Sequence, residues 1–245
     1  QFASSAASDV YKRQAQGNGI MVIVKAAPDA YTRSNGDVVR DAEIQQHLSN
    51  TLSGVFSLGG HWDSCLIEAL IVIHPDFIPI ASGGIPDIRI VVYRGIPVMA
   101  MCRLPTTISN GRANLHQGGI GMGIDLGTGR GIHAIYHDHT VTHHIDTDAS
   151  LLDFVIPQWD AVLMLAAQAS DISGLGYLGV DVVVDANHGP LLLELNARPG
   201  LAIQLANNEG LVPRLERVEA LPQTPLTHWQ DRCQIARELF ACSTP

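Results

Sequence analysis

The sequence is poor in several features that mark whole classes of protein. Its four cysteines are scattered over 245 residues without a CxxC pair, so neither a zinc knuckle nor a disulfide framework is predicted, and a reducing cytoplasm is the simplest compartment. No apolar run reaches the length of a membrane span. The formal net charge of -9 argues against a general nucleic-acid binder, which needs a basic face to neutralise phosphates.

Two common kinds of catalytic motif are also missing. There is no GxSxG elbow to suggest Ser-His-Asp catalysis. Four histidines gather at His137, His139, His143 and His144, but they lack the i, i+4 spacing of HExxH, so a surface loop is favoured over a zinc site. A mean hydropathy of +0.14 and 16% charged residues predict a soluble globular chain with one large domain or two lobes.

The most informative segment is GVDVVVDANHGPLLLELNARPG, residues 179–200. Its two apolar runs, 182–184 and 191–193, flank a cluster of turn-forming residues, which predicts two antiparallel strands. We place the centre of this hairpin between Asn187 and His188, so that residue i pairs with residue 375 minus i.

In this register Asp181 lies directly opposite Glu194, and Asn196 follows on the same face because side chains alternate along a strand. Directly opposed like charges destabilise a sheet, so this pair of carboxylates needs a cation. Two carboxylates and an amide are oxygen ligands that suit Mg²⁺. The alternative is a solvated strand face in a different register.

Hydrophobic periodicity predicts the remaining elements. Strands are expected at 20–25, 66–73, 87–93, 97–103, 119–126 and 131–137, and helices at 40–53, 157–170, about 201–219 and 227–241. Pro157 is placed in the first turn of its helix. Strand pairs mixed with helices, without regular βαβ alternation, predict an α+β fold with helices packed on antiparallel sheets.

Charged side chains interrupt three of the predicted strands. Glu68 lies in an apolar run, so it faces solvent at a sheet edge or meets a ligand. Arg89 and Arg103 could form a double guanidinium clamp for phosphate or carboxylate. The alternative is a structural ion pair between Asp87 and Arg103.

Three other segments are candidates for ligand contacts. The loop NGRANLHQGG at 110–119 contains Asn114 and can supply amide oxygens, unless it is simply a loop. Gly17 and Gly19 form a Gly-rich turn whose backbone N–H groups could approach phosphate, although an ordinary hairpin turn would look the same. Arg198 stands two positions after Asn196, just past the predicted metal ligands and close to where phosphates would lie.

The blocks DIRIVVYRGIPVMAMCR, GRANLHQGG and GYLGVDVVVDANHGPLLLELNARPGLAIQ, in this order, resemble the ATP-grasp fold. The closest group is the alpha-L-glutamate ligase-related one, also called sugar-transfer-associated ATP-grasp, and the resemblance spans residues 15–215. It implies two lobes around an ATP cleft and a ligase that activates a carboxylate as an acyl phosphate for attack by an amine. An ATP-grasp phosphotransferase and a non-catalytic nucleotide-binding module beside polysaccharide machinery are the alternatives.

The resemblance also implies roles for individual residues. Asp181, Glu194 and Asn196 match magnesium ligands, with manganese possible, and the two carboxylates also serve nucleotide binding. Arg89, Arg103 and Asn114 match residues that face phosphate and substrate, with Arg198 in the motif that follows. Glu68 matches the acidic position before the adenine hinge, and Gly17 with Gly19 matches the remainder of the phosphate-covering loop.

The N-terminal segment SSAASDVYKRQ, residues 4–14, looks like a translated sequencing adapter. We therefore expect an N-terminally truncated fragment: a disordered adapter segment (1–14), a remnant of the small lobe (15–75), the large lobe (76–220) and a C-terminal helical tail (221–245). The expected partners are small-molecule carboxylate and amine substrates, or a peptide or sugar acceptor, without nucleic acid or a membrane span.

Overall fold

The computed structural model describes residues 19–57, 60–109, 111, 113–222 and 228–242. The expected adapter segment, residues 1–14, and Gly17 of the predicted Gly-rich turn lie outside the described residues. The chain divides into unit 1, Gln1–Val72, and unit 2, Ile73–Pro245. Both units combine antiparallel strands with helices, which confirms the predicted α+β class.

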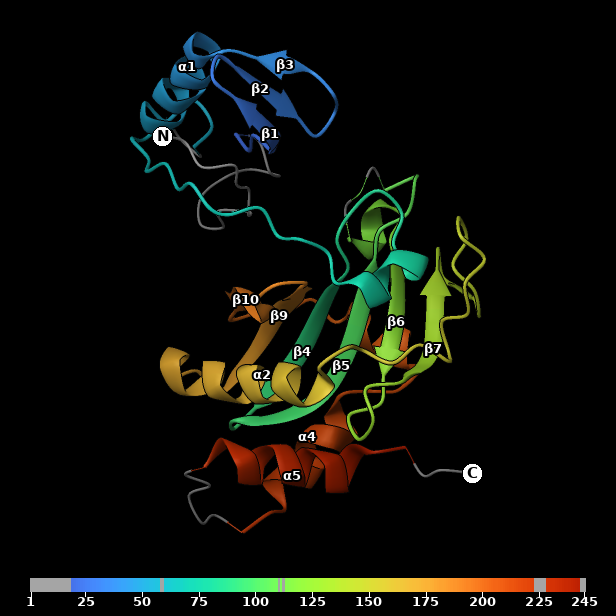
Figure 1. The fold of residues 1–245 in the computed structure, drawn as a ribbon. Helices are drawn as coiled ribbons and strands as arrows, with labels where there is room; N and C mark the ends of the chain where they lie inside the picture. The colour runs from blue at the N-terminus through green and yellow to red at the C-terminus, as the bar shows by residue number, and fades with distance from the viewer. Residues whose placement is uncertain (1–18, 58–59, 110, 112, 223–227, 243–245) are drawn as a thin grey trace. The chain divides into compact units, whose positions relative to one another are not determined.

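Unit 1 contains a small sheet and one helix. Strands β1 (Ile23–Ala27), β2 (Ala30–Arg33) and β3 (Val38–Val39) pair in that order, and α1 (Asp41–Leu52) follows them (Figure 1). The helix predicted at 40–53 is confirmed, whereas the first strand begins three residues later than expected. Within the described part of this unit, Val39 is the one buried hydrophobic side chain.

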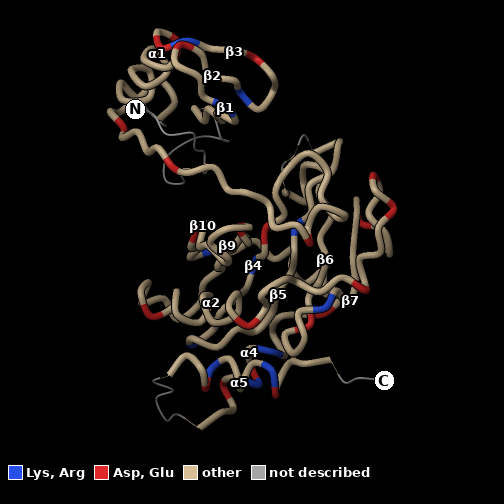
Figure 2. The backbone as a smooth tube through the Cα atoms, in the orientation of Figure 1, with Lys and Arg blue, Asp and Glu red and all other residues tan. Residues whose placement is uncertain are grey.

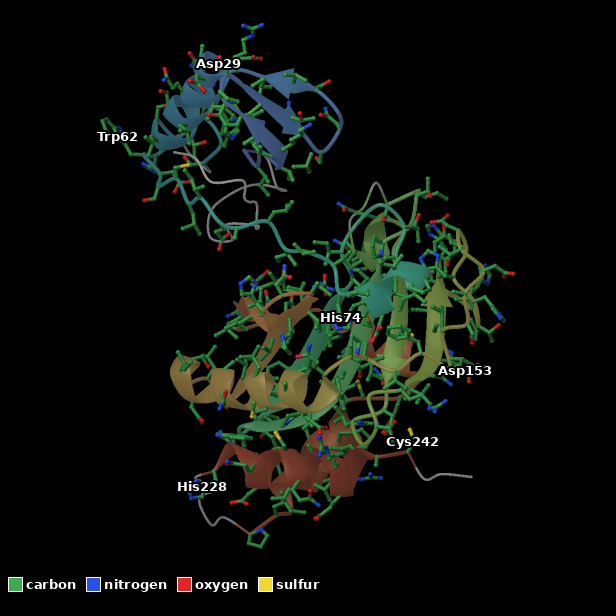
Figure 3. All side chains as sticks on the ribbon, in the orientation of Figure 1. Asp29, Trp62, His74, Asp153, His228 and Cys242 are labelled. Atoms are coloured by element: carbon green, nitrogen blue, oxygen red, sulfur yellow. The ribbon has the colours of Figure 1, made fainter. Side chains whose placement is uncertain are left out.

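The strand predicted at residues 66–73 is wrong. In the described structure this run forms no regular element, and Ile73 makes only an isolated bridge to Asp185. Leu66 and Ile67 are each 58% exposed, and Trp62 just before them is 91% exposed and points away from the ribbon (Figure 3). An apolar run becomes a strand only when a neighbour supplies hydrogen bonds and packing, and this run lies at the boundary between the two units.

Unit 2 is built on one seven-stranded antiparallel sheet in the order β10-β9-β4-β5-β6-β7-β8. The strands are β4 (Asp87–Tyr93), β5 (Ile96–Leu104), β6 (Ile120–Ile124), β7 (Gly131–Tyr136), β8 (His139–Thr140), β9 (Tyr177–Asp185) and β10 (Gly189–Asn196). The four strands predicted between residues 87 and 137 are confirmed, with ends shifted by at most two residues. Arg94 and Gly95 join β4 to β5 with φ of 50° and 77°, the two positive values that a type I′ turn requires.

Helices cover this sheet and complete its core. They are α2 (Trp159–Ser173), α3 (Ala202–Asn207), α4 (Val212–Glu219) and α5 (Trp229–Phe240), and two 3₁₀ turns occupy Pro75–Ile80 and Leu115–Gln117. Helix α2 lies across β9, β4 and β5 (Figure 1), α3 packs on β5, β6 and β7, and α5 packs on β5 and α2. Pro157 precedes α2 and is not in its first turn, because Gln158 has a left-handed φ of 54°.

The central strands decide where charged side chains can lie. Along β4, Ile88 and Ile90 are fully buried in the core, whereas Asp87 and Arg89 are only partly buried on the opposite face. The sheet therefore presents a polar row on one face of its central strands.

No helix in the described part of the chain is long and apolar enough to cross a membrane.

Candidate functional site

The β9–β10 hairpin places the two predicted metal-binding carboxylates opposite each other. Asp181 pairs with Glu194, which confirms the predicted register at this position. Nearer the turn the register differs by one residue, since Leu192 pairs with Val182, and a bulge at Leu193 restores it. The loop of this hairpin has three residues where two were expected. Gly189, which closes the loop, has a positive φ of 73°.

The neighbouring strand brings an arginine to the same row. Arg89 on β4 pairs with Asp181 on β9, so Glu194, Asp181 and Arg89 lie side by side across three strands. Arg103 on β5 pairs with Asp87 on β4, one step along the same face. Antiparallel pairing therefore gathers residues that are up to 107 positions apart in the sequence.

The two arginines converge on one buried carboxylate. Arg89 donates from Nε to Asp181 Oδ1 at 2.8 Å and from Nη2 to Asp181 Oδ2 at 2.6 Å. Arg103 donates from Nη2 to the same Asp181 Oδ2 at 2.9 Å and from Nε to Asp87 Oδ1 at 2.5 Å. The side chain of Asp181 is 4% exposed, and those of Arg89 and Arg103 are 14% and 16% exposed. We call Asp87, Arg89, Arg103 and Asp181 the arginine–aspartate cluster.

The structure thus contains both of the alternatives that the sequence left open. The ion pair between Asp87 and Arg103 forms, and Arg89 with Arg103 also forms a double clamp, but the clamp binds Asp181 of the same chain. Sequence reasoning missed this internal target because it assigned Asp181 to a metal and the arginines to a ligand. The missing signal was the pairing of β4 with β9, which residue spacing alone does not reveal.

The cluster perturbs the protonation of its members. Burial raises the pKa of Asp87 to about 7, and the nearby Asp181 carboxylate adds to this rise while Arg103 and Arg89 oppose it. Burial disfavours the Arg103 cation, yet Asp87 and Asp181 outweigh burial and raise the pKa of Arg103. Arg103 is therefore charged at every physiological pH.

The other residues of the hairpin lie around this cluster. Asn196 is half-buried, and its Nδ2 lies 3.4 Å from Asp181 Oδ2 as a long hydrogen bond. Glu194 is half-buried on β10, the edge strand of the sheet. Arg198 is exposed, whereas Pro199 after it is buried.

Four predicted residues are not part of the cluster. Asn114 caps a 3₁₀ turn, where its Oδ1 accepts from the His116 N–H at 3.0 Å. Gly19, in unit 1, accepts a hydrogen bond at its carbonyl from His47 Nε2 at 2.9 Å. Glu68, also in unit 1, has a buried Oε2 that finds no hydrogen-bond partner among the described residues. Gly17 is outside the described residues.

The donor set on the hairpin fits a hard divalent cation in its chemistry. Asp181 and Glu194 face each other and Asn196 adds an amide, which are oxygen ligands of the kind Mg²⁺ takes. Among the described residues, no three His, Cys, Asp or Glu side chains gather into a metal-binding group, so a metal here would depend on the amide, on water or on a ligand. Both oxygens of Asp181 already accept hydrogen bonds from arginine.

Comparison with known proteins gives a consistent set of relatives. The profile of the family described as sugar-transfer associated ATP-grasp matches residues 10–220. A protein of Maridesulfovibrio salexigens named "probable alpha-L-glutamate ligase" is 27% identical over 194 residues, which cover 76% of this chain and 52% of that protein. One of Hahella chejuensis named "probable alpha-L-glutamate ligase 2" is 46% identical over 48 residues, 19% of this chain and 16% of that protein. The chain spans about half the length of the first relative.

Proposed function

The chain belongs to the sugar-transfer associated ATP-grasp family, and from this membership we propose that the whole protein is an ATP-dependent carboxylate–amine ligase. The names of the two relatives favour a ligase, a reaction class that those names state for the relatives themselves. The carboxylate would attack the terminal phosphoryl group of ATP to give an acyl phosphate and ADP. The amine would then displace phosphate and form an amide.

The observation that carries this proposal is the row formed by Glu194, Asp181 and Arg89 with Arg103 beside it. Phosphoryl transfer requires charge on the transferring group to be neutralised and held in position, and it requires no nucleophile from the protein. Two forked guanidinium groups and two opposed carboxylates supply complementary parts of that task.

Within the row we assign separate tasks. Asp181, Glu194 and Asn196 would hold Mg²⁺, or Mn²⁺ in its place, and the ion would supply charge neutralisation at the phosphates. Arg89 and Arg103 would bind phosphate oxygens, because a guanidinium fork matches phosphate as well as carboxylate.

The remaining predicted residues would contact nucleotide or substrate. Asn114 and Arg198 are assigned to phosphate and substrate, and Gly17 and Gly19 to the nucleotide phosphates. Glu68 is assigned to the nucleotide base, because its Oε2, which has no hydrogen-bond partner within the described part of the chain, is an acceptor for an amino group.

The proposed partners are small molecules. They are a carboxylate and an amine, or a peptide or sugar acceptor in place of one of them, and the proposed compartment is the cytoplasm. Specificity for these molecules would lie in the loops around the site.

The test is ADP release by the whole protein with panels of amino acids and sugar acids, with and without Glu194→Ala. Release that needs both a carboxylate and an amine and falls at least about 100-fold in the variant supports the ligase. Glu238→Gln, at an exposed glutamate on α5, is the matched control and should leave release unchanged. A phosphorylated product without amine dependence points to a phosphotransferase, and nucleotide binding without turnover points to a binding module.

A further inference from the structure

The geometry at Asp181 bears on how metal and nucleotide enter the site. We propose that Arg89 and the divalent metal are alternative partners of Asp181, so that the metal position opens only when phosphate draws Arg89 away. This inference rests on the proposed function in one respect, namely that a metal binds Asp181 when nucleotide is present.

Both carboxylate oxygens of Asp181 are already occupied by arginine. Arg89 uses Nε and Nη2 to cover both oxygens of Asp181, at 2.8 and 2.6 Å, and Arg103 adds a third bond at 2.9 Å. A divalent ion binds a carboxylate oxygen at about 2.1 Å, so it would have to share that oxygen with a guanidinium cation. Two cations within a few ångströms of each other in a buried site repel strongly.

The two arginines are held in place by different partners. Arg103 is anchored by Asp87, which accepts its Nε at 2.5 Å, and spends only one nitrogen on Asp181. Both side-chain hydrogen bonds of Arg89 among the described residues go to Asp181. Arg103 can therefore lose its bond to Asp181 and stay in place, whereas Arg89 has to find a new acceptor.

Arg89 can leave Asp181 only if another acceptor takes the place of the carboxylate. Its side chain is 14% exposed, and leaving a largely buried cation without a partner is costly. A phosphate oxygen pair offers the same bidentate acceptor as a carboxylate, so the exchange replaces bonds and does not merely break them. Because phosphate frees Asp181 for metal and metal stabilises the exchanged state, the two binding events should be positively coupled.

The experiment measures the binding of Mn²⁺ to the full chain in the absence of nucleotide. The electron paramagnetic resonance signal of the free ion, followed during a titration, gives the amount that is bound. Arg89→Lys keeps the charge but cannot cover both oxygens. We expect it to bind Mn²⁺ about tenfold more tightly than wild type, since one charge-assisted hydrogen bond no longer competes. Arg232→Lys, which makes the same change in a guanidinium on α5 that binds both oxygens of Asp171, is the matched control and should leave Mn²⁺ affinity unchanged.

The outcomes separate this proposal from the proposed function. If Asp181→Asn on the Arg89→Lys background removes the gain, the competition at Asp181 is supported. Equal Mn²⁺ affinities of wild type and Arg89→Lys, both lost in Asp181→Asn, would overturn the competition while leaving the metal site intact. Mn²⁺ binding that ignores Asp181 even with a non-hydrolysable ATP analogue would overturn the metal assignment, and the competition with it.

A second measurement uses the wild-type protein and does not depend on the folding of a variant. The Nε–H resonance of Arg89, followed by ¹⁵N nuclear magnetic resonance, should shift on addition of Mg²⁺ with a non-hydrolysable ATP analogue. The corresponding Arg103 resonance should shift less, since Asp87 holds that nitrogen. An unchanged Arg89 signal in a protein that has bound the nucleotide contradicts the proposal.

Discussion

Unit 2 contains two groups of largely buried arginines that differ in the surroundings of their carboxylates. On α5, the side chain of Arg232 is 6% exposed and makes two bonds of 2.6 Å to Asp171, whose side chain is 55% exposed. In the arginine–aspartate cluster, the shared carboxylate of Asp181 is itself only 4% exposed. Both groups pair arginine with aspartate, but the carboxylate of Asp171 is in contact with water whereas that of Asp181 is buried.

This difference separates a structural clamp from a candidate site. Asp171 remains hydrated while it ties α5 to α2, so the carboxylate of this pair carries only a small desolvation penalty. Arginines gather on α4 and α5 (Figure 2), where Arg214 likewise binds Glu209 at 2.6 Å. A buried acid that needs two arginines, with a second acid opposite it, is costly to maintain by comparison and is better explained by ligand binding.

The largest expected effect separates the two groups by activity. Asp181→Asn should lower ADP release by the whole protein at least about 100-fold, because it removes a proposed metal ligand. Asp171→Asn makes the same chemical change in the structural group and should stay within about twofold of wild type. A steady-state ADP assay compares them, and equal losses would remove the distinction.

The next effect is on stability. Arg232→Met should lower the free energy of unfolding by about 2 kcal/mol, since it removes a clamp between α5 and α2 while Asp171 stays hydrated. Urea unfolding followed by tryptophan fluorescence measures this, and nucleotide affinity measured by calorimetry should not change. A variant as stable as wild type would show that the C-terminal clamp is not structural.

A smaller effect concerns pH. Burial raises the pKa of Asp87 from its ordinary 3.8 to about 7, so the folded state holds a proton that the unfolded state releases near pH 4. The resulting stability is fully present below that lower pKa and is lost as pH rises through 7, by about 1 kcal/mol between pH 6 and pH 7. Urea unfolding should show this slope in wild type and not in Asp87→Asn; identical slopes would mean that Asp87 is ionised throughout.

The smallest effect is expected at an exposed position of the site. Arg198→Gln should change the free energy of unfolding by less than about 0.5 kcal/mol, since the side chain is exposed. It should weaken nucleotide binding about threefold, as expected for one solvent-screened charge near phosphate. Calorimetry decides this, and an unchanged affinity would remove Arg198 from the proposed site.

Local patterns were sufficient to predict most of unit 2. Alternation along β4 and β5 and the turn residues of β9–β10 are local signals, and each gave an element with nearly correct bounds. The pairing of Asp181 with Glu194 followed from a hairpin, the one kind of strand contact that spacing determines. Its compensating bulge at Leu193 depends on packing and was not predictable.

Two errors arose where the structure depends on contacts between segments far apart in the sequence. Residues 66–73 have the composition of a buried strand, but strand formation depends on a neighbour that the sequence does not identify. The convergence of Arg89 and Arg103 on Asp181 depends on β4 lying next to β9, which joins segments 92 residues apart. The sequence therefore singled out the charged residues of the arginine–aspartate cluster and left their partners undetermined.

The most direct test of the central claim is a crystal of the protein grown with Mn²⁺ and a non-hydrolysable ATP analogue, with diffraction recorded at a wavelength where manganese scatters anomalously. An anomalous peak bounded by Asp181, Glu194 and Asn196, with Arg89 turned to phosphate, is the predicted result. Bound nucleotide with the manganese peak elsewhere, and Arg89 still on Asp181, would contradict the account.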